Sequence, residues 1–187
     1  PPPEELLAGR DNAAEIERSL ALASRLSYLV WSSAPDARLR DLAAAGKLVD
    51  PRALAEETTR MLEDERSRRF SDTFVRQWLH LDDLGNGTVS TDHYPEYTPE
   101  LGALMVRQTV ATFQDVFHND RDARSLFTDD YLFLNDQLAR LYDLPDVRGG
   151  DLRRIPMERD IGRAGLIAQP SMLAINSNGI DSNPVKR

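Results

Sequence analysis

The chain contains no cysteine. That absence excludes disulfides, thiolate nucleophiles, iron–sulfur clusters and haem attached through Cys-x-x-Cys-His within these residues. The redox compartment stays open. No apolar run approaches the ~20 residues that a membrane-spanning helix needs, so the sequence predicts no membrane span.

The chain also lacks an excess of positive charge. It has 23 lysines and arginines against 31 aspartates and glutamates, which gives a formal net charge of −8. This balance disfavours nucleic acid and anionic membranes as partners. With 187 residues, of which 41% are hydrophobic, the chain has room for a core in one or two domains.

Catalytic signatures are missing as well. The sequence has no G-x-S-x-G elbow, no Walker loop and no dinucleotide-binding fingerprint. A carboxylate pair for glycoside hydrolysis stays open, because 31 acids permit many pairings.

Histidine is scarce and scattered. His80, His93 and His118 form neither His-x-x-x-His nor His-Glu-x-x-His, so we predict no zinc site. His80 and His118 are interpreted as residues that favour helix C-termini. Haem ligation by a histidine and a methionine remains open, although methionine is a common core filler. The four methionines are Met61, Met105, Met157 and Met172.

The most informative stretch is residues 24–51, SRLSYLVWSSAPDARLRDLAAAGKLVDP. Apolar residues recur at helical spacing from Ile16 onward, which predicts one helix that ends near Ser32. Tyr28 and Trp31 are expected to lie in the protein core. Ser33 is predicted to cap a second helix, with Asp36 in capping-box register and Pro35 in the first turn. Gly46 ends that helix, and Asp50-Pro51 starts a third. The expected apolar stripe of the first helix is Ile16, Leu20, Ala23, Leu26 or Ser27, and Val30, widened by Leu22, Leu29 and Trp31.

Further helices follow from the same periodicity. Residues 54–62 suit the third helix, and Phe70, Phe74, Trp78 and Leu81 predict the buried face of a fourth. Thr98-Pro99-Glu100 is a helix start before the long stripe of residues 101–116, and a short helix follows Asn135. Residues 82–97 and 145–162 are expected to be irregular. The predicted fold is all-α, an irregular multi-helix bundle of five to seven helices with long polar loops.

The sequence resembles a planctomycete-type domain of unknown function found in large exported proteins. Its pattern RLSYFLWSS-P-D-L---A--GKL-DP corresponds to Arg25–Pro51, and R-ML-D-RS corresponds to Arg60–Ser67. F---WL-L corresponds to Phe74–Leu81, and LN--LA--YG to Leu134–Tyr142, except that Asp143 replaces the usual glycine.

A second resemblance is to the start of the adjoining domain of unknown function. RGGLL-Q-S-L is matched from Arg163 to Leu173, and T-SPVKRG from Asp181 to Arg187, where Asn183 replaces the usual serine. The expected division is a helical domain at 1–147 and a partial segment of a following domain at 148–187. Pro1-Pro2-Pro3 at one end and Lys186-Arg187 at the other suggest a piece of a longer polypeptide.

The resemblance implies an exported protein, periplasmic or at the cell surface, with a cytochrome c domain and its haem c elsewhere in the polypeptide. No cofactor is expected within this segment. The expected partners are other domains of the same polypeptide, and protein or polysaccharide.

Two groups of residues are candidates for binding. The polar C-terminal stretch is a candidate for a ligand or partner, through Asn176, Asn178, Asp181, Asn183, Lys186 and Arg187. The alternative is a turn that caps a following helix. The loop after the fourth helix fails as an EF-hand, because leucine and histidine occupy required oxygen positions. A looser cation site there would use Asp82, Asp83, Asn86 and Asp92.

We therefore predict a non-catalytic structural or interaction module of a larger exported protein, associated with an electron-transfer domain. The alternative hypothesis is an oxidative or hydrolytic enzyme domain that acts on polysaccharide or another polymer.

Overall fold

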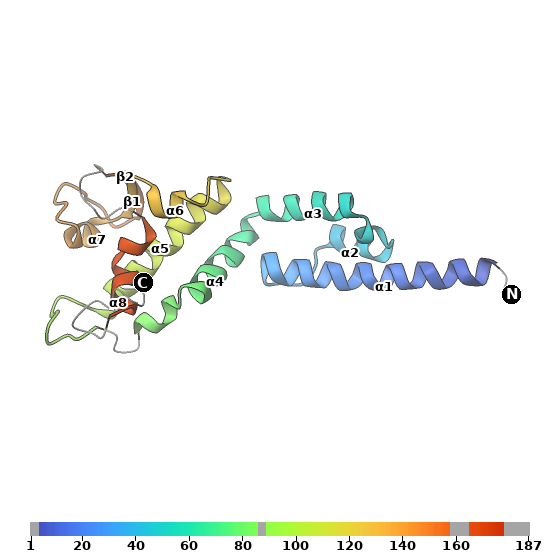
Figure 1. Ribbon diagram of the computed structural model, residues 1–187, viewed down its shortest axis with the longest axis horizontal. Coiled ribbons are helices and arrows are strands. Elements are labelled where there is room, and N and C mark those ends of the chain that lie inside the picture. The colour runs from blue at the N-terminus through green and yellow to red at the C-terminus, as the bar shows by residue number, and fades with distance from the viewer. Residues whose placement is uncertain (1–3, 86–88, 158–164, 178–187) are drawn as a thin grey trace. The chain divides into compact units, whose positions relative to one another are not determined.

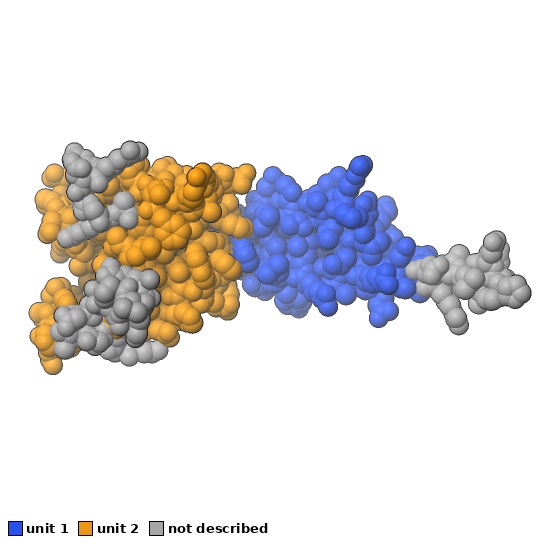
Figure 2. Space-filling view, in the orientation of Figure 1, with its two compact units in different colours: residues 1–70 blue, residues 71–187 orange. Residues whose placement is uncertain are grey.

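The computed structural model is mostly α-helical, with one small sheet (Figure 1). It describes residues 4–85, 89–157 and 165–177, with the side chains of the first helix described from residue 12. The described chain divides into two compact units, residues 1–70 and 71–187 (Figure 2). The predicted helical fold is confirmed.

The first unit contains three α-helices and two 3-10 turns. They are α1 (Glu4–Trp31), α2 (Ala37–Ala44), η1 (Lys47–Val49), α3 (Pro51–Glu63) and η2 (Glu65–Ser67). Its core consists of Ala23, Val30, Trp31, Leu39, Ala43, Leu48 and Met61.

Small side chains let the other elements of the first unit approach α1. Ser19, Ala23 and Ser27 are buried on its inner face. The Ser19 hydroxyl accepts a hydrogen bond from the backbone N–H of Leu48 at 3.0 Å, which attaches η1 to α1.

The predicted stripe of α1 was therefore wrong in part. Leu20, Tyr28 and Leu29 are exposed, Tyr28 to 61%. The buried face is centred on Ser19, Ala23 and Ser27, about one position away from the larger leucines, because close helix contact favours small residues.

Most of the predicted boundaries of α2 and α3 are confirmed. Asp36, not Ser33, caps α2 by accepting from Leu39 N–H at 2.9 Å, so the predicted Ser33 cap was wrong. Gly46 does follow α2 in the left-handed region, at φ 69°. Asp50 caps α3 with Pro51 in its first turn, as predicted.

The second unit begins within α4 (Arg68–Trp78) and is built around α5 (Pro99–His118). The other elements are η3 (Leu81–Gly85), α6 (Ser125–Thr128), β1 (Tyr131–Leu134), α7 (Asp136–Leu141), β2 (Arg153–Pro156), η5 (Leu166–Ala168) and α8 (Pro170–Ile175). Thr98 caps α5 as the sequence predicted, and the short helix predicted after Asn135 is α7, which Asn135 itself caps.

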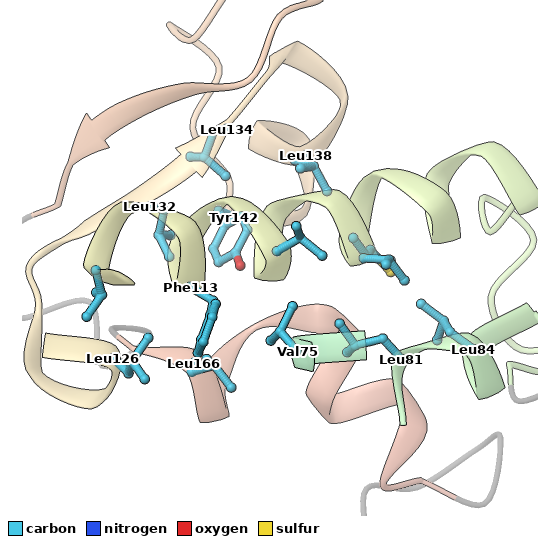
Figure 3. Close-up of a cluster of buried hydrophobic side chains, with 14 residues drawn as sticks. Val75, Leu81, Leu84, Phe113, Leu126, Leu132, Leu134, Leu138, Tyr142 and Leu166 are labelled. Atoms are coloured by element: carbon cyan, nitrogen blue, oxygen red, sulfur yellow. The ribbon is translucent and has the colours of Figure 1, made fainter. Parts of the chain in front are cut away.

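Helix α5 runs through the middle of this second core. Figure 3 shows Leu132, Leu134 and Leu138 on one side of it, and Val75, Leu81 and Leu166 on the other. Nine residues of α5 are buried, which explains its apolar stripe: Gly102, Met105, Val106, Gln108, Thr109, Val110, Thr112, Phe113 and Val116.

The antiparallel pair of β1 and β2 was not predicted. Tyr131 faces Pro156 and Leu134 faces Arg153 across the pair. The stretch 145–162, expected to be irregular, therefore contains a strand at 153–156. A four-residue strand carries too little periodicity to be recognised, and its pairing with β1 is a tertiary contact.

Candidate functional site

The predicted C-terminal site lies mostly outside the described residues. Asn178, Asp181, Asn183, Lys186 and Arg187 all fall there. Asn176 is described, and its side-chain amide donates to the carbonyl of Met172 at 2.8 Å, one turn earlier in the chain. Asn176 thus closes the end of α8.

The acids of the candidate cation loop are not gathered around a common point. Asp82 forms an ion pair with Arg76 at 3.0 Å, and Asp83 and Asp92 are exposed. Asn86 lies outside the described residues. Among the residues that are described, no three histidines or acids are placed to hold a metal ion.

A network of charged side chains surrounds Trp31 in the first unit. Trp31 is fully buried and its indole N–H donates to the carbonyl of Met61 at 3.0 Å. The guanidinium of Arg66 lies over the indole ring, 3.5 Å from its centroid, and that of Arg60 lies at 5.4 Å. Cation–π attraction therefore adds to the burial of the ring.

Glu57, Asp36 and Asp64 are the three acids that balance the arginines of this network. Glu57 is only 1% exposed and accepts hydrogen bonds from Arg38 at 2.7 Å and Arg60 at 2.8 Å. Arg60 also reaches Asp36, the cap of α2, at 2.9 Å. The same contacts that neutralise the buried Glu57 carboxylate therefore join α2 to α3.

These contacts also shift pKa values. Burial raises the pKa of Asp36, but hydrogen bonds from Arg60 and Leu39 N–H outweigh it, so the pKa lies below its ordinary value. Hydrogen bonds from the side chain and backbone of Arg66 lower the pKa of Asp64 to about 2. Both groups are therefore charged at neutral pH, as structural ion pairs require.

A second cluster lies at the end of α5 in the other unit. The Tyr131 hydroxyl donates to Asp115 at 2.7 Å, and Arg121 binds the same carboxylate at 2.6 Å. Arg121 Nη2 also lies 2.7 Å from Asp129 Oδ2, an ion pair without the alignment of a hydrogen bond. Arg154 of β2 covers the Tyr131 ring at 3.8 Å.

This cluster also perturbs its titrating groups. Burial, together with the bond to Asp115, raises the pKa of Tyr131 well above its usual range. Burial also raises the pKa of Asp115, but hydrogen bonds from Tyr131 and Arg121 outweigh it and lower the pKa overall. The cluster therefore holds a neutral phenol against a charged carboxylate and joins α5 to β1.

Two described serine–histidine pairs have the composition of a nucleophile and a base. One is exposed: the Ser90 hydroxyl lies 3.2 Å from His93 Nδ1 in the loop before α5. The other is buried. The Ser71 hydroxyl lies 3.2 Å from His118 Nε2. Ser71 is fully buried in α4, so a substrate cannot reach its oxygen. The contact fixes α4 beside the end of α5 and gives the hydrolytic alternative no accessible nucleophile at this position.

Comparison with known proteins identifies the family of residues 18–144. Residues 18–144 match PSD4, described as a protein of unknown function (DUF1592). The chain belongs to this family. No curated protein matches the chain, and no solved structure does.

The DUF1592 region contains the charged network in full. The resembling blocks at 25–51 and 60–67 supply Trp31, Asp36, Arg60, Asp64 and Arg66 to it. Sequence reasoning assigned Trp31 to the core but missed its charged neighbours. The arginines and aspartates of the 60–67 block were the available signal, since buried charges need partners.

The described part of the DUF1592 region also has an aromatic surface on α4 and α5. We define it as the exposed Phe74 and Trp78 together with Phe113, on which they pack, and Phe117, which stacks on Phe113. Phe74 is 41% and Trp78 46% exposed, so the prediction that they form a buried face was wrong. The buried side chains of α4 are Ser71 and Val75, and the aromatic residues lie beside them.

The rings of the aromatic surface contact one another. The centroid of Phe74 lies 5.8 Å from Trp78 and 5.5 Å from Phe113, and Phe117 stacks on Phe113 at 5.8 Å. Phe113 is itself buried, so it anchors the exposed rings to the core. The result is a packed apolar patch with two large side chains accessible from outside.

Proposed function

We propose that this DUF1592 chain is a non-catalytic interaction module of a larger exported protein, and that its aromatic surface contacts another domain of the same polypeptide. The observation that carries the proposal is the exposure of Phe74 and Trp78 on a fixed aromatic support. Exposed tryptophan held in place by packing is a frequent centre of protein interfaces. Scattered exposed leucines would not support the same argument.

The carboxylates of the two charged clusters favour a binding role over a catalytic one. Glu57, Asp36 and Asp115 are each bound by arginine, so they serve the architecture of the two units. A catalytic acid or base needs access to a substrate proton. The aromatic surface, in contrast, is accessible as it stands.

The resemblance to exported, cytochrome-associated proteins gives the proposal its setting. In that setting the contacted domain is an electron-transfer domain that holds haem c, in the periplasm or at the cell surface. The module would then fix the position of the electron-transfer domain, while the redox chemistry takes place elsewhere in the polypeptide.

Hydroxyl-radical footprinting tests the contact directly. Oxidation of Trp78 and Phe74 is measured by mass spectrometry in the 187-residue chain and in the full-length polypeptide. We expect several-fold less oxidation of both side chains in the full-length protein, because a partner domain covers them. Tyr94, exposed in the loop before α5, is the internal control and should be oxidised equally in both.

A pair of variants supplies the matched control. Phe74→Ser with Trp78→Ser should raise oxidation at the partner domain, whereas Phe127→Ser, an exposed phenylalanine on α6, should not. Circular dichroism checks that both variants fold. Equal oxidation of Trp78 in the chain and in the full-length protein would overturn the proposal.

A further inference from the structure

The segment that follows the DUF1592 match packs on α5 through an unusual polar contact. The match ends at residue 144, and η5 and α8 at residues 166–175 lie beyond it. Figure 3 shows Leu166 beside Phe113 on one side of α5. The segment therefore contacts the central helix of the second unit although it lies outside the family match.

Polar side chains carry much of this contact. Leu166, Gln169 and Ser171 have the segment's most buried side chains, with Gln169 and Ser171 fully inaccessible. The apolar Met172, Ala174 and Ile175 are only partly buried, and Ile167 is exposed. Two of the three most buried side chains are thus polar. Unlike apolar side chains, they need hydrogen-bond partners when they are buried.

The hydrogen bonds of this contact form a chain with one consistent direction. The Ser171 hydroxyl lies 2.6 Å from that of Thr109, and Thr109 Oγ1 donates to Gln169 Oε1 at 2.6 Å. Gln169 Nε2 donates to Thr112 Oγ1 at 2.9 Å, and Thr112 donates to the carbonyl of Gln108 at 3.0 Å. Because Thr109 has one proton, which it gives to Gln169, Ser171 is the donor to Thr109.

This chain requires an amide at position 169. Glutamine accepts from Thr109 with its oxygen and donates to Thr112 with its nitrogen, whereas a carboxylate only accepts. A carboxylate would also be a buried charge, and no arginine or lysine takes part in the hydrogen-bond chain. The α5 site therefore discriminates between two side chains of the same size.

Backbone geometry fixes where the segment begins. Gly165 has φ 78° and ψ 170°, a conformation that is nearly restricted to glycine. A Cβ there would lie 2.5 Å from the carbonyl oxygen of Phe127, at the end of α6. The close approach to α6 and the hydrogen bonds to α5 together set the register of the segment.

We propose that α5 of the DUF1592 fold carries a docking site for a Gly-Leu-x-x-Gln-x-Ser segment, and that its occupant is residues 165–177 of this chain. Thr109 and Thr112 read the glutamine amide, and Thr109 also receives the serine hydroxyl. These hydrogen bonds attach residues 165–177, which lie beyond the family match, to α5 in one fixed register. Because two of the three most buried side chains of the segment are polar, we expect residues 165–177 to open as a unit of their own.

Hydrogen exchange of the full 187-residue chain tests the proposal with Gln169→Glu. Exchange of the amides in 166–177 should become about tenfold faster or more, as expected when a buried donor–acceptor match is lost. Exchange in β1 and α7 should stay within about twofold of wild type, since local opening leaves the other elements folded. Gln137→Glu, at an exposed glutamine of α7, is the matched control and should leave the segment unchanged.

Addition in trans separates docking from ordinary core packing. A synthetic peptide of residues 165–177 is added to the Gln169→Glu chain, and the amide resonances of Thr109 and Thr112 are followed by NMR. We expect the wild-type peptide to shift them, and the same peptide with the Gln169→Glu substitution to leave them unchanged.

Two results would overturn the proposal. One is that Gln169→Glu accelerates exchange equally in the segment, α5, β1 and α7, which would make the segment part of one indivisible core. The other is that both peptides bind alike, which would remove the discrimination by the amide. If Gln169→Glu fails to fold, Thr112→Val takes its place, because valine keeps the shape and removes the hydroxyl.

Discussion

At the scale of residues, the first unit depends on a buried carboxylate. Glu57 is almost inaccessible, yet it accepts from Arg38 and Arg60 while Arg60 also reaches Asp36. The cost of desolvating a carboxylate is offset only when such partners are present. The charged side chains around Trp31 therefore stabilise one another, because removal of one would leave another without its partner.

Glu57→Gln should destabilise the first unit. A neutral amide keeps the shape but weakens the bonds to Arg38 and Arg60, so we expect a loss of about 1.5–3 kcal/mol, the range for hydrogen bonds to charged groups. Urea unfolding measures the change. Glu56→Gln alters the exposed neighbouring acid and should change the stability little; equal effects of the two variants would contradict a special role for Glu57.

Asp143 departs from the family pattern, which has glycine at this position. Asp143, which occupies the usual glycine position after Tyr142, has φ 56°. Glycine adopts this left-handed conformation without the steric cost that a Cβ brings. The pattern's glycine is thus a conformational requirement of the turn after α7, and aspartate meets it less well.

Asp143→Gly should therefore stabilise the protein by about 0.5–1 kcal/mol. The change removes the Cβ clash of the left-handed region, and the greater entropy of glycine in the unfolded chain offsets part of that gain. Thermal unfolding measures the gain. Asp146→Gly, at an exposed position in the same loop without a positive φ, should be neutral or destabilising. A stabilisation by Asp146→Gly of the same size would refute the explanation.

At the scale of elements, charges fasten the short turns of the first unit. Asp64 caps η2 by accepting from the backbone N–H of Arg66 at 2.9 Å, and its carboxylate binds the Arg66 side chain at 2.7 Å. Arg66 in turn covers Trp31. Protonation of one carboxylate thus weakens the contact between η2 and α1.

The pH dependence follows from the lowered pKa of Asp64. A carboxyl group whose pKa falls from 3.8 to about 2 on folding contributes stability above pH 3.8, and this contribution is lost as pH falls through about 2. We therefore expect wild type to lose more stability than Asp64→Asn between pH 4 and pH 2. Urea unfolding across this range measures it.

The control for this titration is Asp41→Asn, at an exposed acid of α2, which should follow the wild-type pH profile. The carboxyl carbon of Asp64 in NMR gives the midpoint directly. A midpoint near 3.8 would show that the ion pair with Arg66 does not persist in solution.

At the scale of the whole molecule, the chain has two separate cores. Met61 lies in the core of the first unit and Leu132 in that of the second, and both are essentially inaccessible. No helix among the described residues is long and apolar enough to cross a membrane. Each core belongs to a compact unit of its own, so each is expected to respond to mutation by itself.

Met61→Ala and Leu132→Ala should each destabilise one unit by about 2–5 kcal/mol, as large-to-small changes in cores do. Hydrogen exchange should accelerate in α1 and α3 for Met61→Ala, and in α5 and β1 for Leu132→Ala. The double variant should show the sum of the two effects, since sites in different cores that share no partners are additive. Acceleration of both units by either single variant would contradict independent cores.

The division of the chain into domains at residue 147 stays a prediction. The described residues of 148–187 contribute β2 beside β1 and the 166–175 segment beside α5. The family match ends at residue 144.

Local chemistry in the sequence determined where three of the described helices begin, namely α3, α5 and α7. Asp50-Pro51, Thr98-Pro99 and Asn135 each act on backbone groups within a few residues, so their effect is visible without tertiary contacts. The family resemblance likewise followed from the sequence, because its blocks are short and specific.

Tertiary structure alone decided which face of each helix is buried and which polar groups meet. A stripe with Phe74 and Trp78 is as apolar as a core stripe, but the neighbouring Ser71 and Val75 face the core, and only packing selects between adjacent faces. Thr109 and Gln169 are sixty residues apart and meet across two elements. Hydrophobic periodicity records an average over a helix face, whereas burial depends on the shape of the elements that cover it.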